Sequence, residues 1–129
     1  MPHRSLAVLI PLALMAFSNA PAAERLPSRV GACVDTHIKS VGARLMDGPD
    51  PVEDSGVDVE FTNGARQVSY EHVPQAERSR PGDPVRMCLL ETPRDCPPGD
   101  DRGRLYRTTN LRTRQTWVLR DSEHICGGA

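Results

Sequence analysis

The chain is poor in aromatic residues and has no long apolar segment after residue 17. Aromatic side chains make up 4% of the 129 residues, and Trp117 is the single tryptophan. A membrane-spanning helix needs about 20 apolar residues, and the longest apolar run, residues 6–17, is shorter. We therefore expect no membrane anchor. We also expect a small core that depends on covalent cross-links.

Signatures of common enzyme classes and metal sites are also missing. There is no G-x-S-x-G nucleophile motif and no EF-hand spacing. Cys96, His124 and Cys126 lack the paired spacing of structural zinc sites, and Asp121-Ser-Glu-His124 is too local to form a catalytic triad. The acidic segment 47–60 is interpreted as a solvated loop, with calcium binding and paired acids for glycoside hydrolysis as open alternatives. We predict no cofactor and no metal.

Residues 1–23 have the organisation of an export signal. Arg4 precedes the apolar run 6–17, and small residues around Ala22 and Ala23 offer a cleavage site. The sequence before Cys33 superficially resembles a lipoprotein box, but charged residues separate it from the apolar run. We predict a periplasmic or secreted protein with a signal peptide, residues 1–23, and one domain, residues 24–129.

Four cysteines in an exported chain indicate two disulfides. Three pairings are possible. The expected strand directions bring Cys126 to the same end of the sheet as Cys96, and they leave Cys33 and Cys88 on strands that can neighbour each other. We favour Cys33–Cys88 with Cys96–Cys126 over the other two combinations.

Alternation of apolar and polar residues predicts strands, whereas sustained helical periodicity is absent. Alternation is clearest on either side of Asn63-Gly64, which predicts a hairpin with a type I′ turn and positive φ at both positions. Gln67 falls on its polar face, and Gly42 in the first strand is expected to be a bulge or bend. Further strands are expected at residues 33–39, 84–91, 104–109 and 115–120, with one helical turn near residues 75–78. The predicted fold is an all-β, single-domain barrel or sandwich of about six short antiparallel strands, stapled by two disulfides.

Charge is unevenly distributed although the net charge is only −1. Acidic residues fill segment 47–60, and arginines crowd the carboxy-terminal third. Because Arg, Tyr and Trp dominate binding hot spots, we predict a binding surface formed by Arg104, Tyr106, Arg107, Arg112, Arg114 and Trp117. An acidic protein surface or a cell-envelope glycan is the expected partner. Nucleic acid is not expected, because the exported chain is not basic overall.

The carboxy-terminal third contains a distinctive pattern of residues: Cys96-Pro-Pro-Gly-Asp100, Arg102-Gly103, Tyr106, Asn110, Arg112-Thr113, Trp117 and DSEHICGGA ending at Ala129. Ser69-Tyr70 and Arg80-x-Gly82-Asp83 fit the same pattern. The pattern resembles a family of small exported bacterial proteins of unknown function and covers most of residues 24–129. The resemblance implies export and a single domain, and it implies no activity or ligand.

The absence of catalytic signatures in a small, disulfide-bonded chain predicts a non-enzymatic binding module. An inhibitor or immunity-type protein that binds an acidic partner would fit this description. The alternative is a small cell-envelope hydrolase that uses acids or one of His37, His72 and His124 in a cleft.

Overall fold

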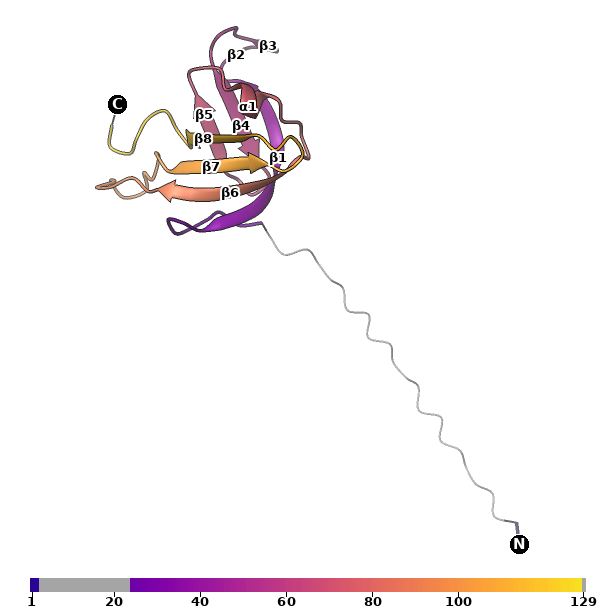
Figure 1. The fold of residues 1–129 in the computed structure, drawn as a ribbon. Helices are drawn as coiled ribbons and strands as arrows, with labels where there is room; N and C mark the ends of the chain where they lie inside the picture. The colour runs from indigo at the N-terminus through magenta and orange to yellow at the C-terminus, as the bar shows by residue number, and fades with distance from the viewer. Residues whose placement is uncertain (3–23, 129) are drawn as a thin grey trace.

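The computed structural model describes residues 1–2 and 24–128, so the predicted signal segment lies largely outside the described residues. The main sheet contains β1 (Cys33–Ala43), β4 (Val57–Phe61), β5 (Arg66–Ser69), β6 (Pro84–Glu91), β7 (Leu105–Asn110) and β8 (Thr116–Arg120). Its order is β5-β4-β1-β6-β7-β8, and every neighbouring pair is antiparallel. The sheet curls into a half-barrel (Figure 1), which confirms the predicted all-β fold of about six strands.

Two small elements complete the fold. A two-stranded ribbon, β2 (Met46–Asp47) and β3 (Asp50–Pro51), projects beyond the main sheet, and α1 (Pro74–Glu77) is a single helical turn beside β4 (Figure 1). The helical turn was expected near this position. In the described part of the chain, no helix is both long and apolar enough to cross a membrane.

Alternation along the strands explains which side chains form the core. In β6, Val85, Met87 and Leu89 are at most 1% exposed, while Arg86 between them faces solvent. Full burial of side chains of this size stabilises the fold by about 1.5–3 kcal/mol each. These three side chains belong to the core on the inner face of the curled sheet (Figure 1).

A bulge in β1 changes the partner of this long strand. Residues 33–37 pair with β6, whereas residues 38–43 pair with β4, and the register with β4 shifts between Ile38 and Ser40. A bulge increases the local bend and twist of a strand. The bend was predicted at Gly42, but the extra residue is Lys39, because the register from Ser40 to Ala43 is regular.

The β4–β5 hairpin is confirmed, but its turn differs from the prediction. Only Gly64 in this turn has positive φ, at 88°. The Gly64 amide donates to Phe61 O at 3.1 Å, and the Phe61 amide donates to Ala65 O at 3.0 Å. This is the three-residue connection with a glycine bulge rather than a type I′ turn. Asn63 accepts a hydrogen bond from the Ala65 amide through its side chain, and this bond favours the observed loop.

A buried glutamine joins the two outer strands of the half-barrel. Gln67 of β5 is 0% exposed. Its Nε2 donates to the carbonyls of Tyr106 and Leu119, both at 3.0 Å, and its Oε1 accepts from Thr108 Oγ1 at 2.7 Å and Trp117 Nε1 at 2.9 Å. The prediction that Gln67 lies on the polar face was wrong. Its side chain spans the gap between β5 and β8 that no backbone ladder closes.

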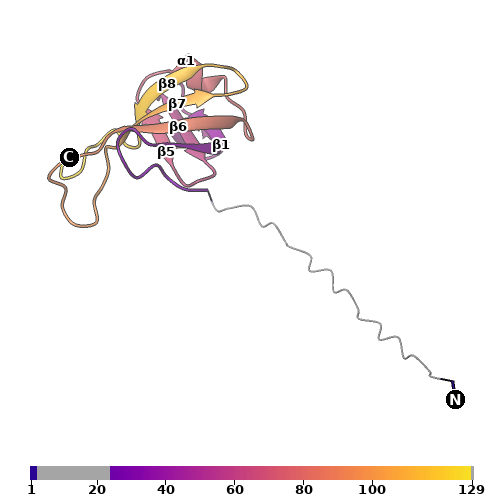
Figure 2. The same ribbon diagram turned by 60° about the horizontal axis from the view of Figure 1, so that its bottom comes forward.

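Both favoured disulfides are confirmed. Cys33 and Cys88 lie directly opposite each other on β1 and β6, with a Cα–Cα distance of 4.0 Å. Cys96 and Cys126 are 5.2 Å apart and join the proline-rich loop to the carboxy-terminal tail. Figure 2 shows this loop and tail side by side at one end of the sheet. Removing a native disulfide from a small domain typically costs about 2–5 kcal/mol.

Candidate functional site

The two aromatic residues of the predicted binding surface lie in the interior. Tyr106 is 2% exposed and Trp117 is 4% exposed. Burial raises the pKa of the Tyr106 hydroxyl, and Trp117 donates its indole hydrogen to Gln67. These side chains therefore pack the core beneath the strands, and the predicted surface retains only its arginines.

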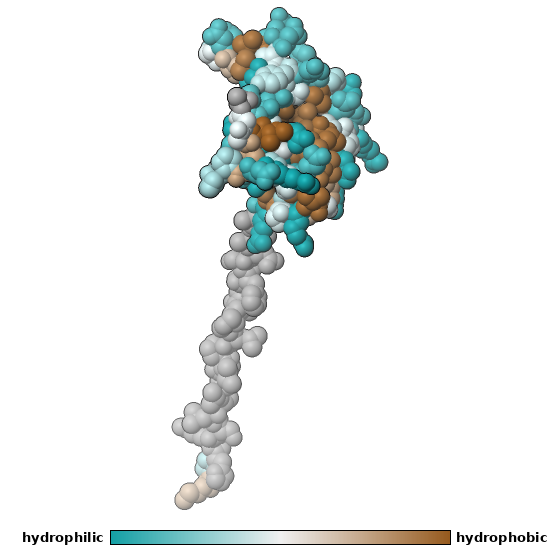
Figure 3. All heavy atoms as spheres, turned by 90° about the vertical axis from the view of Figure 1, so that its left-hand side faces the viewer, coloured by the Kyte–Doolittle hydropathy of each residue, from teal (hydrophilic) through white to brown (hydrophobic). Residues whose placement is uncertain are grey.

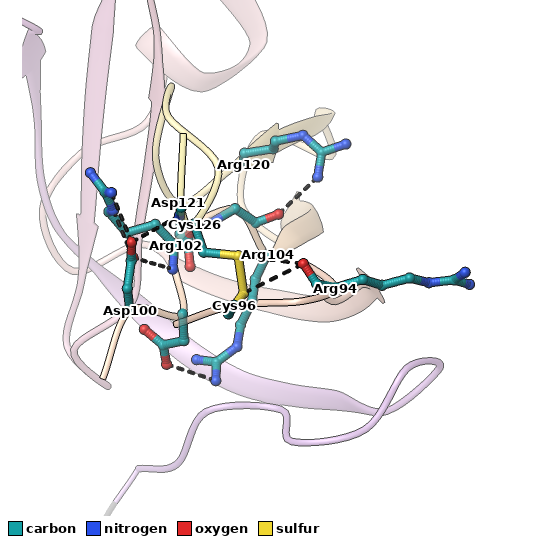
Figure 4. The surroundings of a disulfide bond; sticks show 11 residues. Arg94, Cys96, Asp100, Arg102, Arg104, Arg120, Asp121 and Cys126 are labelled. Atoms are coloured by element: carbon teal, nitrogen blue, oxygen red, sulfur yellow. Dashed lines mark hydrogen bonds and ion pairs between the residues drawn. A yellow bond between two sulfur atoms is a disulfide. The ribbon is translucent and has the colours of Figure 1, made fainter. Parts of the chain in front are cut away.

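The structure separates the four predicted arginines into three places. Arg104 lies near the Cys96–Cys126 disulfide and pairs with Asp101 at 2.9 Å (Figure 4). Arg107 is exposed on the outer face of β7. Arg112 and Arg114 lie in the connection between β7 and β8. Of the four, only Arg112 and Arg114 lie in the same connection.

The disulfide end holds a compact set of carboxylates. Asp100 receives two hydrogen bonds from the Arg102 guanidinium, at 2.8 and 2.9 Å, which hold the pKa of Asp100 well below its usual range (Figure 4). Asp121 accepts from the Gly103 amide at 2.7 Å, but its partial burial raises its pKa. These carboxylates organise the loop, and Asp100 and Asp101 pair with Arg102 and Arg104.

A buried carboxylate fixes the orientation of Arg112. Asp83 is 6% exposed and precedes β6. Arg112 donates Nε to Asp83 Oδ1 at 2.6 Å and Nη2 to Asp83 Oδ2 at 2.9 Å, and Asn110 donates to the same carboxylate at 2.9 Å. The bidentate Arg112 bond is the main reason that the pKa of Asp83 lies well below its usual range.

This ion pair joins two loops that each carry exposed arginines. Arg112 also donates Nη2 to the Arg78 carbonyl at 3.1 Å. Arg78 and Arg80 on one loop and Arg114 on the other are exposed, and none of them forms an ion pair within residues 24–128. We call Arg78, Arg80, Arg112 and Arg114 the basic end.

The sequence interpretation missed Arg78 and Arg80, because it placed the binding surface only between residues 104 and 117. The sequence did contain a sign that these arginines lack acidic partners, because Asp83 is the only acidic residue between Arg78 and Leu90. One acid among several arginines indicates that the acid binds one arginine and leaves the others free. Which arginine it binds depends on the fold.

A pocket of about 400 Å³ lies at the other charged region of the molecule. It is lined by Val41, Gly42, Ala43, Pro51, Val52, Glu53, Asp54, Gly56, His72 and Glu77. The acidic segment that was predicted as a solvated loop therefore forms part of a concave site. His37 and His124 do not line this pocket.

His72 is held between two carboxylates in this pocket. Its Nε2 lies 3.0 Å from Asp54 Oδ1, and its Nδ1 lies 3.0 Å from Glu77 Oε1. Both ring nitrogens can donate only when the imidazole is protonated, so the bond to Asp54, followed by that to Glu77, raises the pKa of His72. The three side chains lie on two segments, the loop before β4 and the segment containing α1.

The chemistry available in the pocket is limited. Its lining contains no serine, threonine, cysteine, tyrosine or lysine, so its reactive side chains are His72 and the carboxylates of Glu53, Asp54 and Glu77. His72 could act on a water molecule only after releasing one of its carboxylate partners. Within the described residues, no cluster of three or more His, Cys, Asp or Glu side chains is arranged to hold a metal ion.

Hydrophobic surface is interspersed with these charged regions. Val118, Ile125 and Leu111 are among the exposed large apolar residues, each close to half exposed. Figure 3 shows an area of hydrophobic surface bordered by hydrophilic residues on the face toward the viewer.

Comparison of the chain with protein-family models, curated proteins and solved structures finds no match.

Proposed function

We propose that this protein is a non-enzymatic, exported binding module whose basic end contacts an anionic partner. The observation that carries the proposal is the bidentate bond between buried Asp83 and Arg112. This bond neutralises Asp83, the one acidic group between the two loops. Arg78, Arg80 and Arg114 are then available to a ligand. Export is supported by the two disulfides, which are typical of oxidising compartments.

The physical basis of this binding would be local rather than global. The net charge of the chain is −1, so the whole molecule does not attract anions. Clustered arginines create a local positive potential, and their planar donors match carboxylates and other oxyanions. An acidic protein surface or an acidic cell-envelope glycan offers such groups. An inhibitor or immunity-type role that masks an acidic enzyme surface would use the same contacts.

A small cell-envelope hydrolase is the second candidate, and the concave pocket at His72 is the observation that favours it. Such an enzyme would need His72 to activate water with Asp54 as its partner. Release of reducing ends from cell-wall glycan by the wild-type protein, and its loss in His72→Ala, would support this candidate. Equal release by both proteins, or none, would remove it.

The binding proposal can be tested with two triple variants of equal charge. Arg78→Ala, Arg80→Ala and Arg114→Ala remove three exposed arginines of the basic end, and Arg25→Ala, Arg29→Ala and Arg94→Ala remove three exposed arginines elsewhere. Binding to immobilised polyglutamate and to polygalacturonate is measured at several salt concentrations. We expect the first variant to bind about tenfold more weakly, because each exposed ion pair contributes up to about 1 kcal/mol. Equal weakening by both variants would contradict the proposal.

A further inference from the structure

One edge of β1 has no partner over the second half of the strand. β6 pairs with β1 only over residues 33–37, while β4 occupies the opposite edge over residues 38–43. The last backbone bonds on the β6 side link Ile38 to Asp83 and Gly82, at 2.9 and 2.8 Å. Within residues 24–128, no strand continues the sheet on that side beyond Ile38.

The direction of the free backbone groups follows from the ladder. The Arg44 amide donates to Gly56 O at 3.1 Å, so Arg44 faces the β4 side of the strand. Backbone groups of alternate residues point to opposite edges, and the N–H and C=O groups of Val41 and Ala43 therefore face the open edge. Both residues also line the pocket that contains His72. One wall of this pocket is thus an open strand edge.

The other walls define the chemistry of a ligand. Pro51 and Val52 supply apolar surface, and Glu53, Asp54 and Glu77 supply three carboxylates. His72 is the only residue in the lining that can carry a positive charge, and it is bonded to two of those carboxylates. The pocket therefore favours positive charge beside a short apolar contact, next to backbone groups that can extend a sheet.

We propose that this pocket binds an extended segment of a partner protein by strand addition to β1 at Val41 and Ala43. The segment carries a lysine or arginine, with a small apolar residue two positions away. Residues two apart in a strand point to the same face, so the basic side chain reaches the carboxylates while the apolar one contacts Val52. Strand addition supplies affinity through main-chain bonds, and the side-chain pocket supplies specificity.

This inference does not depend on the basic end. The basic end attracts anions, whereas the pocket selects a cationic side chain. An experiment can therefore contradict the proposal for one site and leave the proposal for the other unaffected. The pocket volume of about 400 Å³ lies in the usual range for ligand sites, about 300–1,000 Å³. Open strand edges are also surfaces that proteins normally cover or use.

The test uses the intact chain and a fluorescent pentapeptide, acetyl-Ser-Lys-Ser-Val-Ser-amide. Fluorescence anisotropy should show saturable binding. Replacing Lys with Glu in the peptide should abolish binding. Methylating its backbone nitrogens should weaken binding at least tenfold, because the methylated peptide cannot donate main-chain bonds. The protein is unchanged in both comparisons, so loss of folding cannot produce the effect.

Two protein variants complete the test. Glu53→Gln should weaken peptide binding about threefold, because Glu53 lines the pocket and forms no hydrogen bond or ion pair with another residue of 24–128. The triple alanine variant at Arg78, Arg80 and Arg114 should bind the peptide as the wild type does. Equal binding of parent and methylated peptides would overturn the proposal, as would absence of binding. A concentration-dependent dimer that protects the Val41 and Ala43 amides without peptide would assign the edge to a second copy and also overturn it.

Discussion

Asp83 and His72 flank α1 in the sequence, and both face groups of opposite charge, but only Asp83 is withdrawn from water. Asp83 is 6% exposed and bonds to Arg112, Asn110 and the Arg80 amide. The His72 side chain is 56% exposed, and that of its partner Asp54 is 91% exposed. The Asp83–Arg112 pair and the His72–Asp54 pair therefore differ in their effect on the structure. The buried pair fixes the loops of the basic end, whereas the exposed pair is weakened by the surrounding solvent.

The largest expected effect tests whether burial, rather than charge, determines how much a polar side chain contributes to the stability of the fold. Gln67 is uncharged and fully buried, and Gln67→Leu would leave Trp117 Nε1, Thr108 Oγ1 and two carbonyls without this partner. We expect a loss of about 3 kcal/mol in the free energy of unfolding, measured with urea. Gln75→Leu, at an exposed position of α1, is the matched control and should cause no measurable loss. A loss below about 1 kcal/mol in Gln67→Leu would show that the half-barrel does not depend on this residue.

A smaller effect is expected where a buried charge has a partly exposed partner. Asp83→Asn should lower the free energy of unfolding by about 2 kcal/mol at neutral pH, because it breaks the bidentate bond to Arg112. Asp54→Asn is the matched control, and asparagine also tolerates the positive φ of 55° at that position. It should leave stability unchanged. Similar losses in the two variants would erase the distinction between the sites.

The pH dependence of the Asp83 effect has a definite sign. The folded-state pKa of Asp83 is depressed, mainly by Arg112. Its contribution to stability is therefore complete above the ordinary aspartate pKa of about 4 and is lost as pH falls through the lower folded value. The difference between wild type and Asp83→Asn should shrink only in strong acid. A difference that instead shrinks between pH 6 and 8 would contradict this assignment.

The smallest effect concerns His72, whose pKa is raised mainly by Asp54. A raised folded pKa stabilises the protein below the ordinary histidine pKa, 6.5, and this contribution is lost as pH rises through the folded value. His72→Gln should therefore lower the midpoint of thermal unfolding slightly at pH 5.5 and not at pH 9. His124→Gln, an exposed histidine outside the pocket, serves as the control. A His72→Gln effect that is equal at both pH values would contradict the predicted ionic role.

The strands and disulfides could be predicted because they depend on local patterns. Alternation predicted the strands at residues 84–91 and 104–109, and the expected strand directions brought Cys126 to the same end as Cys96. These features require only the period of a strand and the direction of the chain. The structure confirms strands close to the predicted ranges 84–91, 104–109 and 115–120.

The polar interior and the pocket could not be predicted in the same way. Gln67 follows the polar positions of its strand, and its burial depends on the approach of β5 to β8, which no local pattern encodes. The pocket is assembled from three segments, residues 41–43, 51–56 and 72–77. The tie between Asp83 and Arg112 likewise joins groups that lie 29 residues apart. Each feature depends on the curl of the sheet and the bulge in β1.

Nitrogen-15 NMR of the intact chain during titration with polyglutamate tests the central claim most directly. If the basic end binds anions, amide shifts should concentrate in residues 78–83 and 110–115, and they should fade as salt is added. The variant with alanine at Arg78, Arg80 and Arg114 should lose most of these shifts, because it removes the three exposed guanidinium groups. Shifts spread evenly over exposed arginines, or centred on the disulfide end at residues 92–103, would contradict the account.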